Sequence, residues 1–287
     1  EKYRDARQPE AVLRTLRTAL GRAWSASIAG GSKKTRLAAS PVVANDTVYV
    51  IDTDAVVHAF AASNGSERWR KNLGVSGDGK DSVFGGGVSF EGGRVYATTG
   101  VGDVVALDAT TGNVLWKVRP AGPMRGAPTI AGGQIYAITQ DNQIYALNAE
   151  DGKTVWNESG TLENSGIFGV AAPSVAQGTV VAGFSSGELT AYRYENGRAV
   201  WQDALSRTNM STAVASLSDI DADPVIVEGK VYAIGQGGRM VALDIVTGQR
   251  LWELNIGGIA TPWVAGDWIF VVTHQAQLVW SGRANGK

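Results

Sequence analysis

A glycine followed four residues later by a tryptophan recurs five times along this chain. The pairs are Gly65 with Trp69, Gly112 with Trp116, Gly152 with Trp156, Gly197 with Trp201 and Gly248 with Trp252. An apolar run comes before each glycine, and a second short run carries the tryptophan, as in the stretch from Ala106 to Trp116. Two short apolar runs joined by turn residues are typical of a β-hairpin. The sequence therefore predicts a chain built from repeated hairpins.

Two more short strands are predicted ahead of each hairpin. The first opens each unit, at Pro41-Val42-Val43, Val88-Ser89-Phe90, Pro128-Thr129-Ile130, Pro173-Ser174-Val175, Pro224-Val225-Ile226 and Pro262-Trp263-Val264. The second follows seven residues later, with turn residues between the two. Four short antiparallel strands repeated every 40 to 51 residues are typical of a β-propeller. We therefore predict an all-β fold, a β-propeller of four-stranded antiparallel blades, of which five to six are visible in this chain.

The repeated tryptophan is predicted to pack between neighbouring blades. A lone four-stranded blade has two faces to cover, and it covers them by stacking against its neighbours around a ring. Burying one indole removes about 200 Å² from water, which stabilises the fold by at most about 5 kcal/mol. Replacement of one such tryptophan by alanine is expected to cost about 3–5 kcal/mol. A role in stacking on a ligand is the alternative.

Composition narrows the classes of function. The chain has 287 residues, 44% hydrophobic and 18% charged, which is enough for a large core in one or two domains. The formal net charge of −1 offers no excess of positive charge to attract phosphates, which argues against general nucleic-acid binding. There is no cysteine, so thiol catalysis, thiolate metal sites and disulfides are excluded. No apolar run reaches the roughly 18 residues of a membrane span.

Residues 1–22 differ from the rest of the chain and are predicted to form an N-terminal tether or short helix. Four apolar residues recur there at helical spacing: Val12, Leu13, Leu16 and Leu20. A partner-binding amphipathic helix is the alternative. Residues 23–287 are predicted to form the propeller domain. Within it, Trp24 is predicted to lie in an outer strand that has no preceding partner strands. Because the last unit stops at Lys287, where the next tryptophan would be due, we expect this sequence to be a piece of a longer chain with further C-terminal blades.

Residues able to carry chemistry are few. The segment Asp219-Ile220-Asp221-Ala222-Asp223 begins like a calcium loop, but an EF-hand needs glycine at its sixth position and glutamate at its twelfth. This chain has Pro224 and Lys230 there. The only histidines, His58 and His274, fall at unrelated points of the repeat, so neither a Ser/His/Asp triad nor a zinc site is predicted. We expect no enzyme activity, no metal and no cofactor.

Two glycine clusters resemble nucleotide-binding loops only superficially. Neither Gly85-Gly86-Gly87 nor Gly235-Gln236-Gly237-Gly238 lies between a strand and a helix, as a dinucleotide site requires. Turns or bulges are the expected structure at both.

The stretch Ala106-Leu107-Asp108-Ala109-Thr110-Thr111-Gly112-Asn113-Val114-Leu115-Trp116 resembles the repeat of the PQQ-like (quinoprotein-type) propellers. The residue after the repeated tryptophan is never aspartate, which separates this repeat from the WD40 repeat. Two branches of the superfamily matter: the PQQ-dependent dehydrogenases, and the BamB family of the outer-membrane β-barrel assembly (BAM) machinery. Many dehydrogenases have an adjacent cysteine pair, which is absent here, and this chain shows no evident carboxylate set for calcium. A dehydrogenase-like enzyme and a carbohydrate- or polymer-binding propeller remain alternatives.

The segment Leu217-Ser218-Asp219-Ile220-Asp221-Ala222-Asp223-Pro224-Val225 resembles the L-S-D-[VI]-D-x-x-P-V segment of the BamB family. The resemblance covers the chain from Leu20 to Lys287 and implies eight blades in the full protein. Three other stretches resemble the alphaproteobacterial form of the family: Phe84-Gly85-Gly86-Gly87, Arg125-Gly126-Ala127-Pro128, and the stretch from Gly257 to Asp267.

This resemblance also implies a partner. In the family, the L-S-D-x-D segment and the loop before the preceding blade contact BamA. The implied partner-binding residues here are Leu217, Ser218, Asp219, Ile220, Asp221, Ile167 and Phe168. Phe168 stands where better-known members have the arginine of a Leu-Arg pair, which implies a rebuilt partner surface.

The function implied by the resemblance is that of a non-enzymatic scaffold subunit of the BAM complex. It would bind the periplasmic domains of BamA and aid the delivery and insertion of outer-membrane proteins. Unfolded outer-membrane proteins are a second implied class of partner. The implied location is the periplasmic side of the outer membrane, with a lipid anchor on an N-terminal cysteine that this sequence does not include.

Overall fold

The computed structural model describes residues 21–28, 40–74, 86–161, 171–205 and 219–287. Its regular elements are all strands, as the repeat predicts. Nearly all of the predicted tether or helix lies outside the described residues. Within the described ranges, no helix is long and apolar enough to cross a membrane.

The strands are β1 (Val42–Ala44), β2 (Thr47–Ile51), β3 (Val56–Ala61), β4 (Glu67–Asn72), β5 (Gly86–Glu91), β6 (Arg94–Thr99), β7 (Val104–Asp108), β8 (Val114–Val118), β9 (Thr129–Ala131), β10 (Gln134–Ile138), β11 (Gln143–Asn148), β12 (Thr154–Ser159), β13 (Ser174–Ala176), β14 (Thr179–Gly183), β15 (Glu188–Arg193), β16 (Ala199–Ala204), β17 (Val225–Val227), β18 (Lys230–Gly235), β19 (Arg239–Asp244), β20 (Arg250–Leu254), β21 (Trp263–Ala265), β22 (Trp268–Val272) and β23 (Leu278–Gly282).

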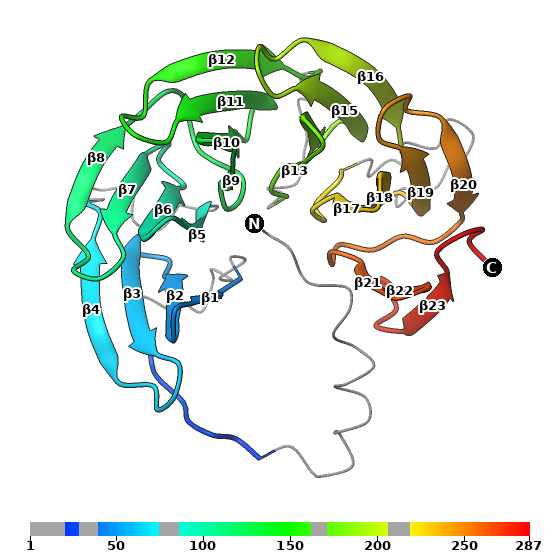
Figure 1. Ribbon diagram of the computed structural model, residues 1–287. Helices are drawn as coiled ribbons and strands as arrows, with labels where there is room; N and C mark the ends of the chain where they lie inside the picture. Colours follow the sequence, from blue (N-terminus) through cyan, green and yellow to red (C-terminus); the bar gives the residue numbers. More distant parts are fainter. Residues whose placement is uncertain (1–20, 29–39, 75–85, 162–170, 206–218) are drawn as a thin grey trace. The chain divides into compact units, whose positions relative to one another are not determined.

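These strands form antiparallel sheets strictly in chain order (Figure 1). Five sheets have four strands each: β1–β4, β5–β8, β9–β12, β13–β16 and β17–β20. The sixth, β21–β23, has three strands within the described residues. Every opening run predicted from the sequence overlaps the first strand of its sheet, and where the run begins with proline the strand begins at the next residue. The prediction of four-stranded antiparallel repeats is therefore confirmed.

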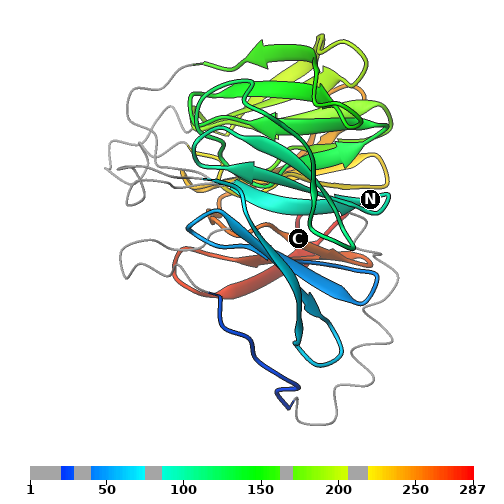
Figure 2. The ribbon, with the colours of Figure 1, turned by 90° about the vertical axis from the view of Figure 1, so that its left-hand side faces the viewer.

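By its internal contacts, the described chain divides into two compact units, residues 22–157 and 158–287. The boundary falls within β12, the last strand of the third sheet. The first unit holds the first three sheets, which follow one another in chain order from blue to green in Figure 2. The second unit holds the sheets from β13 onward.

The aspartate that precedes two of the hairpin turns, Asp108 and Asp244, has a local structural role. The Asp108 carboxylate accepts hydrogen bonds from the backbone N–H groups of Thr110 and Thr111 at 3.0 and 2.8 Å, and from the Thr111 hydroxyl at 2.9 Å. Gly112 then adopts a φ of +71°, which favours glycine. These hydrogen bonds lower the pKa of Asp108, because they favour its charged form. The Asp-x-x-Thr-Gly pattern thus specifies a turn rather than a binding site.

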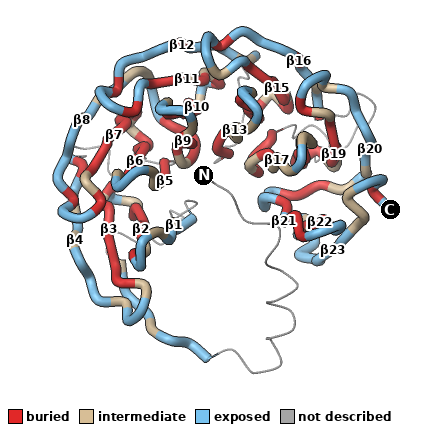
Figure 3. Tube along the Cα trace, viewed as in Figure 1, coloured by how far each residue is buried: buried red, intermediate tan, exposed pale blue. Residues whose placement is uncertain are grey.

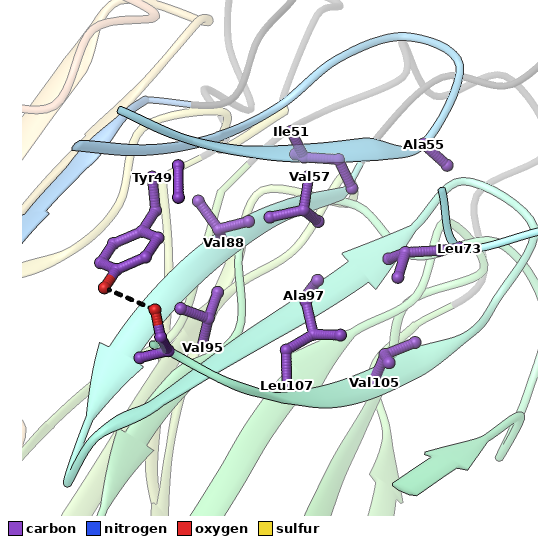
Figure 4. Close-up of a cluster of buried hydrophobic side chains, with 12 residues drawn as sticks. Tyr49, Ile51, Ala55, Val57, Leu73, Val88, Val95, Ala97, Val105 and Leu107 are labelled. Atoms are coloured by element: carbon purple, nitrogen blue, oxygen red, sulfur yellow. Dashed lines mark hydrogen bonds between the residues drawn. The ribbon is translucent and has the colours of Figure 1, made fainter. Parts of the chain in front are cut away.

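Neighbouring sheets pack through apolar side chains from their second and third strands. Figure 4 shows this between the first two sheets, where Val57 of β3 and Val95 of β6 are both fully buried. The Tyr49 hydroxyl donates across the same interface to the carbonyl oxygen of Ala109 at 3.2 Å. Along the chain, β7 and its equivalents are buried whereas the fourth strands are largely exposed (Figure 3).

The repeated tryptophan crosses from one sheet to the next, as predicted. Five indoles lie against the turn glycine of a sheet in their own unit, and the Nε1 of each donates to a carbonyl oxygen in that turn. Within the two units the indole–carbonyl pairs are Trp24 with Ala62, Trp69 with Ala109, Trp116 with Ala149, Trp201 with Ile245 and Trp252 with Arg283, at 2.8 to 3.1 Å. Trp24 makes this contact although residues 21–28 belong to no described strand. The glycine and the tryptophan of the repeat therefore serve contacts between sheets.

Candidate functional site

The predicted partner-binding residues fall partly within the structure. Asp219, Ile220 and Asp221 are described and lie in the unit of residues 158–287, directly before β17. Leu217, Ser218, Ile167 and Phe168 lie outside the described residues. We refer to residues 219–223 as the acidic strap.

The carboxylates of the acidic strap lie inside the protein. Asp219 is 2% exposed and Asp221 is 8% exposed. The Gln236 side-chain amide donates to Oδ2 of Asp221, and the Gln236 backbone N–H donates to the Asp219 carbonyl oxygen at 2.9 Å. Because buried polar groups need hydrogen-bond partners, Gln236 and Asp221 satisfy one another. Asp221 thus holds the strap against the turn between β18 and β19.

Ile220 anchors the strap to the preceding sheet. Its side chain is fully buried, and its N–H donates to the carbonyl oxygen of Phe184 at 3.2 Å. A Cβ at Gly183 would lie only 2.5 Å from Cγ2 of Ile220. Glycine at 183 therefore lets Ile220 approach the end of β14.

Asp223 ties the strap to two other segments. Its Oδ1 accepts the backbone N–H of Ala172 at 2.7 Å, across 51 residues of chain. Its own N–H donates to the hydroxyl of Thr261 at 3.2 Å, ahead of β21. A hydrogen bond from a backbone N–H to a carboxylate is charge-assisted and stronger than a neutral one. Three successive sheets therefore meet at the strap.

The turn at Gln236 extends this network toward β22. The Gln236 carbonyl oxygen accepts from Nε2 of His274 at 2.9 Å, and the His274 backbone N–H donates to Gly257 at 3.3 Å. His274 thus has a structural role, in which its ring and its backbone both bind backbone carbonyl oxygens. The predicted turn at Gly235-Gln236-Gly237-Gly238 is confirmed, but its glutamine has a role that the pattern did not reveal.

His58, in the unit of residues 22–157, is the second histidine and is also structural. Its Nε2 lies 3.0 Å from Oδ2 of Asp52, and its Nδ1 lies 3.2 Å from Oε1 of Glu67. The other oxygen of Asp52 accepts the N–H groups of Asp54 and Val56, which closes the β2–β3 turn. The two ring nitrogens point in opposite directions, so one ion cannot bind both.

The described residues do not fit a quinone–calcium site of the dehydrogenase branch. A calcium ion takes six to eight oxygen ligands, mostly carboxylates and carbonyls. Within the described ranges no three His, Asp or Glu side chains are arranged to hold a metal ion.

Sequence reasoning found the strap but not the residues that hold it. Gln236 and Asp223 were not identified as site residues, and no signal in the repeat singles them out. Gln236 stands between glycines in a turn, and Asp223 precedes a proline. Their hydrogen bonds join segments 15 to 51 residues apart, which periodicity cannot show.

The chain is similar to outer-membrane assembly factors over most of its length. The family described as "Outer membrane protein assembly factor BamB" matches residues 53–287. The BamB protein of Salmonella typhimurium is 34% identical over 260 residues, which are 89% of this chain and 66% of that protein. The Escherichia coli protein is 33% identical over 261 residues, 90% of this chain and 66% of that protein. The chain thus spans just under two thirds of the length of these relatives.

Solved structures are also similar to this chain. The crystal structure of BamB from Moraxella catarrhalis superposes with a TM-score of 0.75 at 24% identity, covering 86% of this chain and 73% of that one. A quinohemoprotein alcohol dehydrogenase from Pseudomonas putida gives 0.62 at 18% identity, covering 82% and 44%. These likenesses bear on the fold alone, and the predicted β-propeller is confirmed.

Proposed function

Because the chain belongs to the BamB family of outer membrane protein assembly factors, we propose that it is a non-enzymatic scaffold subunit of the BAM complex. In this role it binds BamA and aids the delivery and insertion of outer-membrane proteins. The observation that carries the proposal is the family match over residues 53–287, which includes the acidic strap.

The proposed BamA-binding surface comprises Leu217 to Asp221 together with Ile167 and Phe168. Its two parts are consistent with one surface, because Asp223 of the strap binds the backbone of Ala172 just after the second part. Asp219 and Asp221 are buried, so they contribute by holding the strap rather than by offering charge to a partner. The neighbouring segments then supply the side chains that BamA meets.

The experiment is a pull-down with the periplasmic domains of BamA. Wild type is expected to capture BamA, and the double variant Asp219→Ala/Asp221→Ala is expected to lose capture. Circular dichroism and thermal unfolding show whether the variant is still folded. Unchanged capture by a folded double variant would refute the assigned surface.

We propose unfolded outer-membrane proteins as the second class of partner, bound at the outer edges of the sheets. The fourth strands are edge strands and expose apolar side chains just before the repeated tryptophan, at Leu115, Val155, Val200 and Leu251. An extended chain can add to such an edge through backbone hydrogen bonds. Photo-crosslinkers at Leu115 and Leu251 are expected to give adducts with a nascent porin. A crosslinker at Arg68, the charged equivalent in β4, is the matched control.

We place the full-length protein on the periplasmic side of the outer membrane, held by a lipid anchor, as its family membership suggests. We also propose the alphaproteobacterial form of the family. Three sequence stretches support that proposal, residues 84–87, 125–128 and 257–267. The Salmonella typhimurium and Escherichia coli relatives are gammaproteobacterial.

A further inference from the structure

The turn between β14 and β15 contacts three described residues that flank the segments 162–170 and 206–218, namely Thr161, Leu205 and Ile220, and the strap binds the fourth, Ala172. The turn is closed by hydrogen bonds from Gly187 N–H to the Phe184 carbonyl oxygen at 3.0 Å and from Phe184 N–H to Glu188 at 2.9 Å. Phe184 is fully buried. This turn, residues 184–188, therefore offers a rigid base on which other chain segments can be fixed.

The first segment is held at both of its ends. Before it, Thr161 donates its N–H to Oε2 of Glu188 at 2.7 Å and its hydroxyl to Oε1 at 2.9 Å. The Ser186 hydroxyl donates to the same carboxylate at 2.9 Å, which orients it. After the segment, the Ala172 N–H is accepted by Asp223 at 2.7 Å.

The residues that flank the second segment bind the same turn, residues 184–188. Before it, the N–H of buried Leu205 donates to the Gly187 carbonyl oxygen at 2.8 Å. After it, the N–H of Ile220 donates to Phe184 at 3.2 Å. Four chain ends therefore converge on one turn and on the strap bonded to it.

From this geometry we propose that Glu188 and Asp223 are positioning residues: they fix Thr161 and Ala172, so that these two chain ends form one frame for partner binding with Leu205 and Ile220. The inference rests on the proposed function, because the partner is BamA. Glu188 fixes Thr161 and Asp223 fixes Ala172, whereas Leu205 and Ile220 are fixed by backbone hydrogen bonds alone. The two carboxylates are thus the side chains through which substitution can loosen the frame. Neither needs to contact the partner.

Two variants of Asp223 test whether this residue acts by positioning Ala172 or through its negative charge. Asp223→Ala removes the acceptor for Ala172, whereas Asp223→Asn keeps an oxygen in the same place and removes only the charge. Glu188→Ala removes both acceptors for Thr161. Glu195→Ala is the matched control, since Glu195 is an exposed carboxylate of the same unit in the turn after β15.

The first readout needs no partner. Hydrogen exchange of the free protein is expected to speed up at Ala172 in Asp223→Ala and at Thr161 in Glu188→Ala. Exchange at Ala172 is expected to stay unchanged in Asp223→Asn. Exchange at Thr161 is expected to stay unchanged in Glu195→Ala. Unchanged exchange in both alanine variants would overturn the frame, whatever the partner does.

The second readout is affinity for the periplasmic domains of BamA. Each alanine variant is expected to bind about 3- to 30-fold more weakly than wild type, as is usual for residues that act without touching the ligand. Asp223→Asn is expected to bind within about twofold of wild type. The double variant Glu188→Ala/Asp223→Ala is expected to lose less than the product of the single effects, because both act on one frame.

The outcomes distinguish the proposed function, BamA binding, from the positioning role of Glu188 and Asp223. If wild type does not bind BamA, the proposed function fails and the positioning role falls with it. If wild type binds and both folded alanine variants bind equally well, only the positioning role is refuted. If Asp223→Asn weakens binding as much as Asp223→Ala, the charge itself acts on the partner, which also contradicts positioning.

Discussion

The indole of Trp201 lies so close to Gly248 of the next sheet that a Cβ on this glycine would be 2.5 Å from Cγ of the tryptophan. The same indole donates from Nε1 to the Ile245 carbonyl oxygen at 2.8 Å. One side chain therefore fills the space above the turn and also satisfies its backbone. The pairing recurs at Trp69 and Gly112, so it explains why glycine and tryptophan repeat together.

Gly248→Ala should destabilise the protein by about 2–5 kcal/mol. The added methyl group meets the Trp201 ring, and the φ of +72° strains any residue with a Cβ. Thermal unfolding checks this. Gly266→Ala is the control, because Gly266 has a φ of +56° and no heavy atom within 4 Å of the added Cβ. It should cost only the backbone strain, about 1–2 kcal/mol; equal losses in both variants would show that the indole contact is unimportant.

Trp201→Ala should cost about 3–5 kcal/mol, because it empties a buried site between two sheets. Trp201→Phe keeps part of the ring but leaves the Ile245 carbonyl oxygen without this donor. It should therefore lose less than the alanine variant and more than an exposed substitution such as Val246→Ala. Chemical denaturation ranks the three variants. A ranking in which Trp201→Ala is as stable as wild type would contradict packing between sheets.

Asp103 should make the stability of the first unit depend on acid pH. Burial alone would raise the pKa of Asp103, but hydrogen bonds from Arg119 and Lys117, at 2.8 and 2.9 Å, outweigh it and lower the pKa below its ordinary value. A lowered folded-state pKa means that the stabilisation is complete above the unfolded value of about 4 and is lost as the pH falls through the folded value.

Thermal unfolding between pH 7 and pH 3 measures this effect. Asp103→Asn should be less stable than wild type at pH 7, and the difference should shrink below about pH 4. The variant Lys117→Gln/Arg119→Gln removes the two cations; burial alone then raises the pKa of Asp103, so the contribution of this group should reverse and favour the folded state at acid pH. A difference that stays constant from pH 7 to pH 3 would rule out this ion pair as the source.

We expect Asp221 to support BamA capture through its hydrogen bond with Gln236 and not through its charge. Asp221→Ala and Gln236→Ala each remove the hydrogen bond between these two buried side chains, so both should weaken BamA capture and lower the unfolding temperature. Asp221→Asn can still accept from Gln236 and should retain most of the capture. Loss of capture in Asp221→Asn at an unchanged unfolding temperature would mean that the carboxylate faces the partner.

The sequence predicted the fold well because the fold is a repeat. Spacing alone identified the hairpins, the first strands such as β13, and the passage of Trp116 toward the next sheet. Each of these depends on residues close together in the chain, where turn chemistry and strand alternation operate.

The interior of the candidate site was not predictable in the same way. Asp219 and Asp221 were expected to contact a partner, and the structure instead buries them against the turn at Gln236. A charged residue in a polar connecting segment usually faces water, so only the three-dimensional contacts show the reverse. Likewise, nothing near Glu188 in the sequence indicates that it holds Thr161.

The scaffold role is tested most directly by titrating the purified chain with the periplasmic domains of BamA and measuring binding by calorimetry. We expect saturable binding with one site per chain, and we expect Asp219→Ala/Asp221→Ala to bind more weakly while remaining folded. A folded wild-type chain that gives no binding signal would contradict the scaffold role, and a folded double variant with the wild-type affinity would refute the assigned surface.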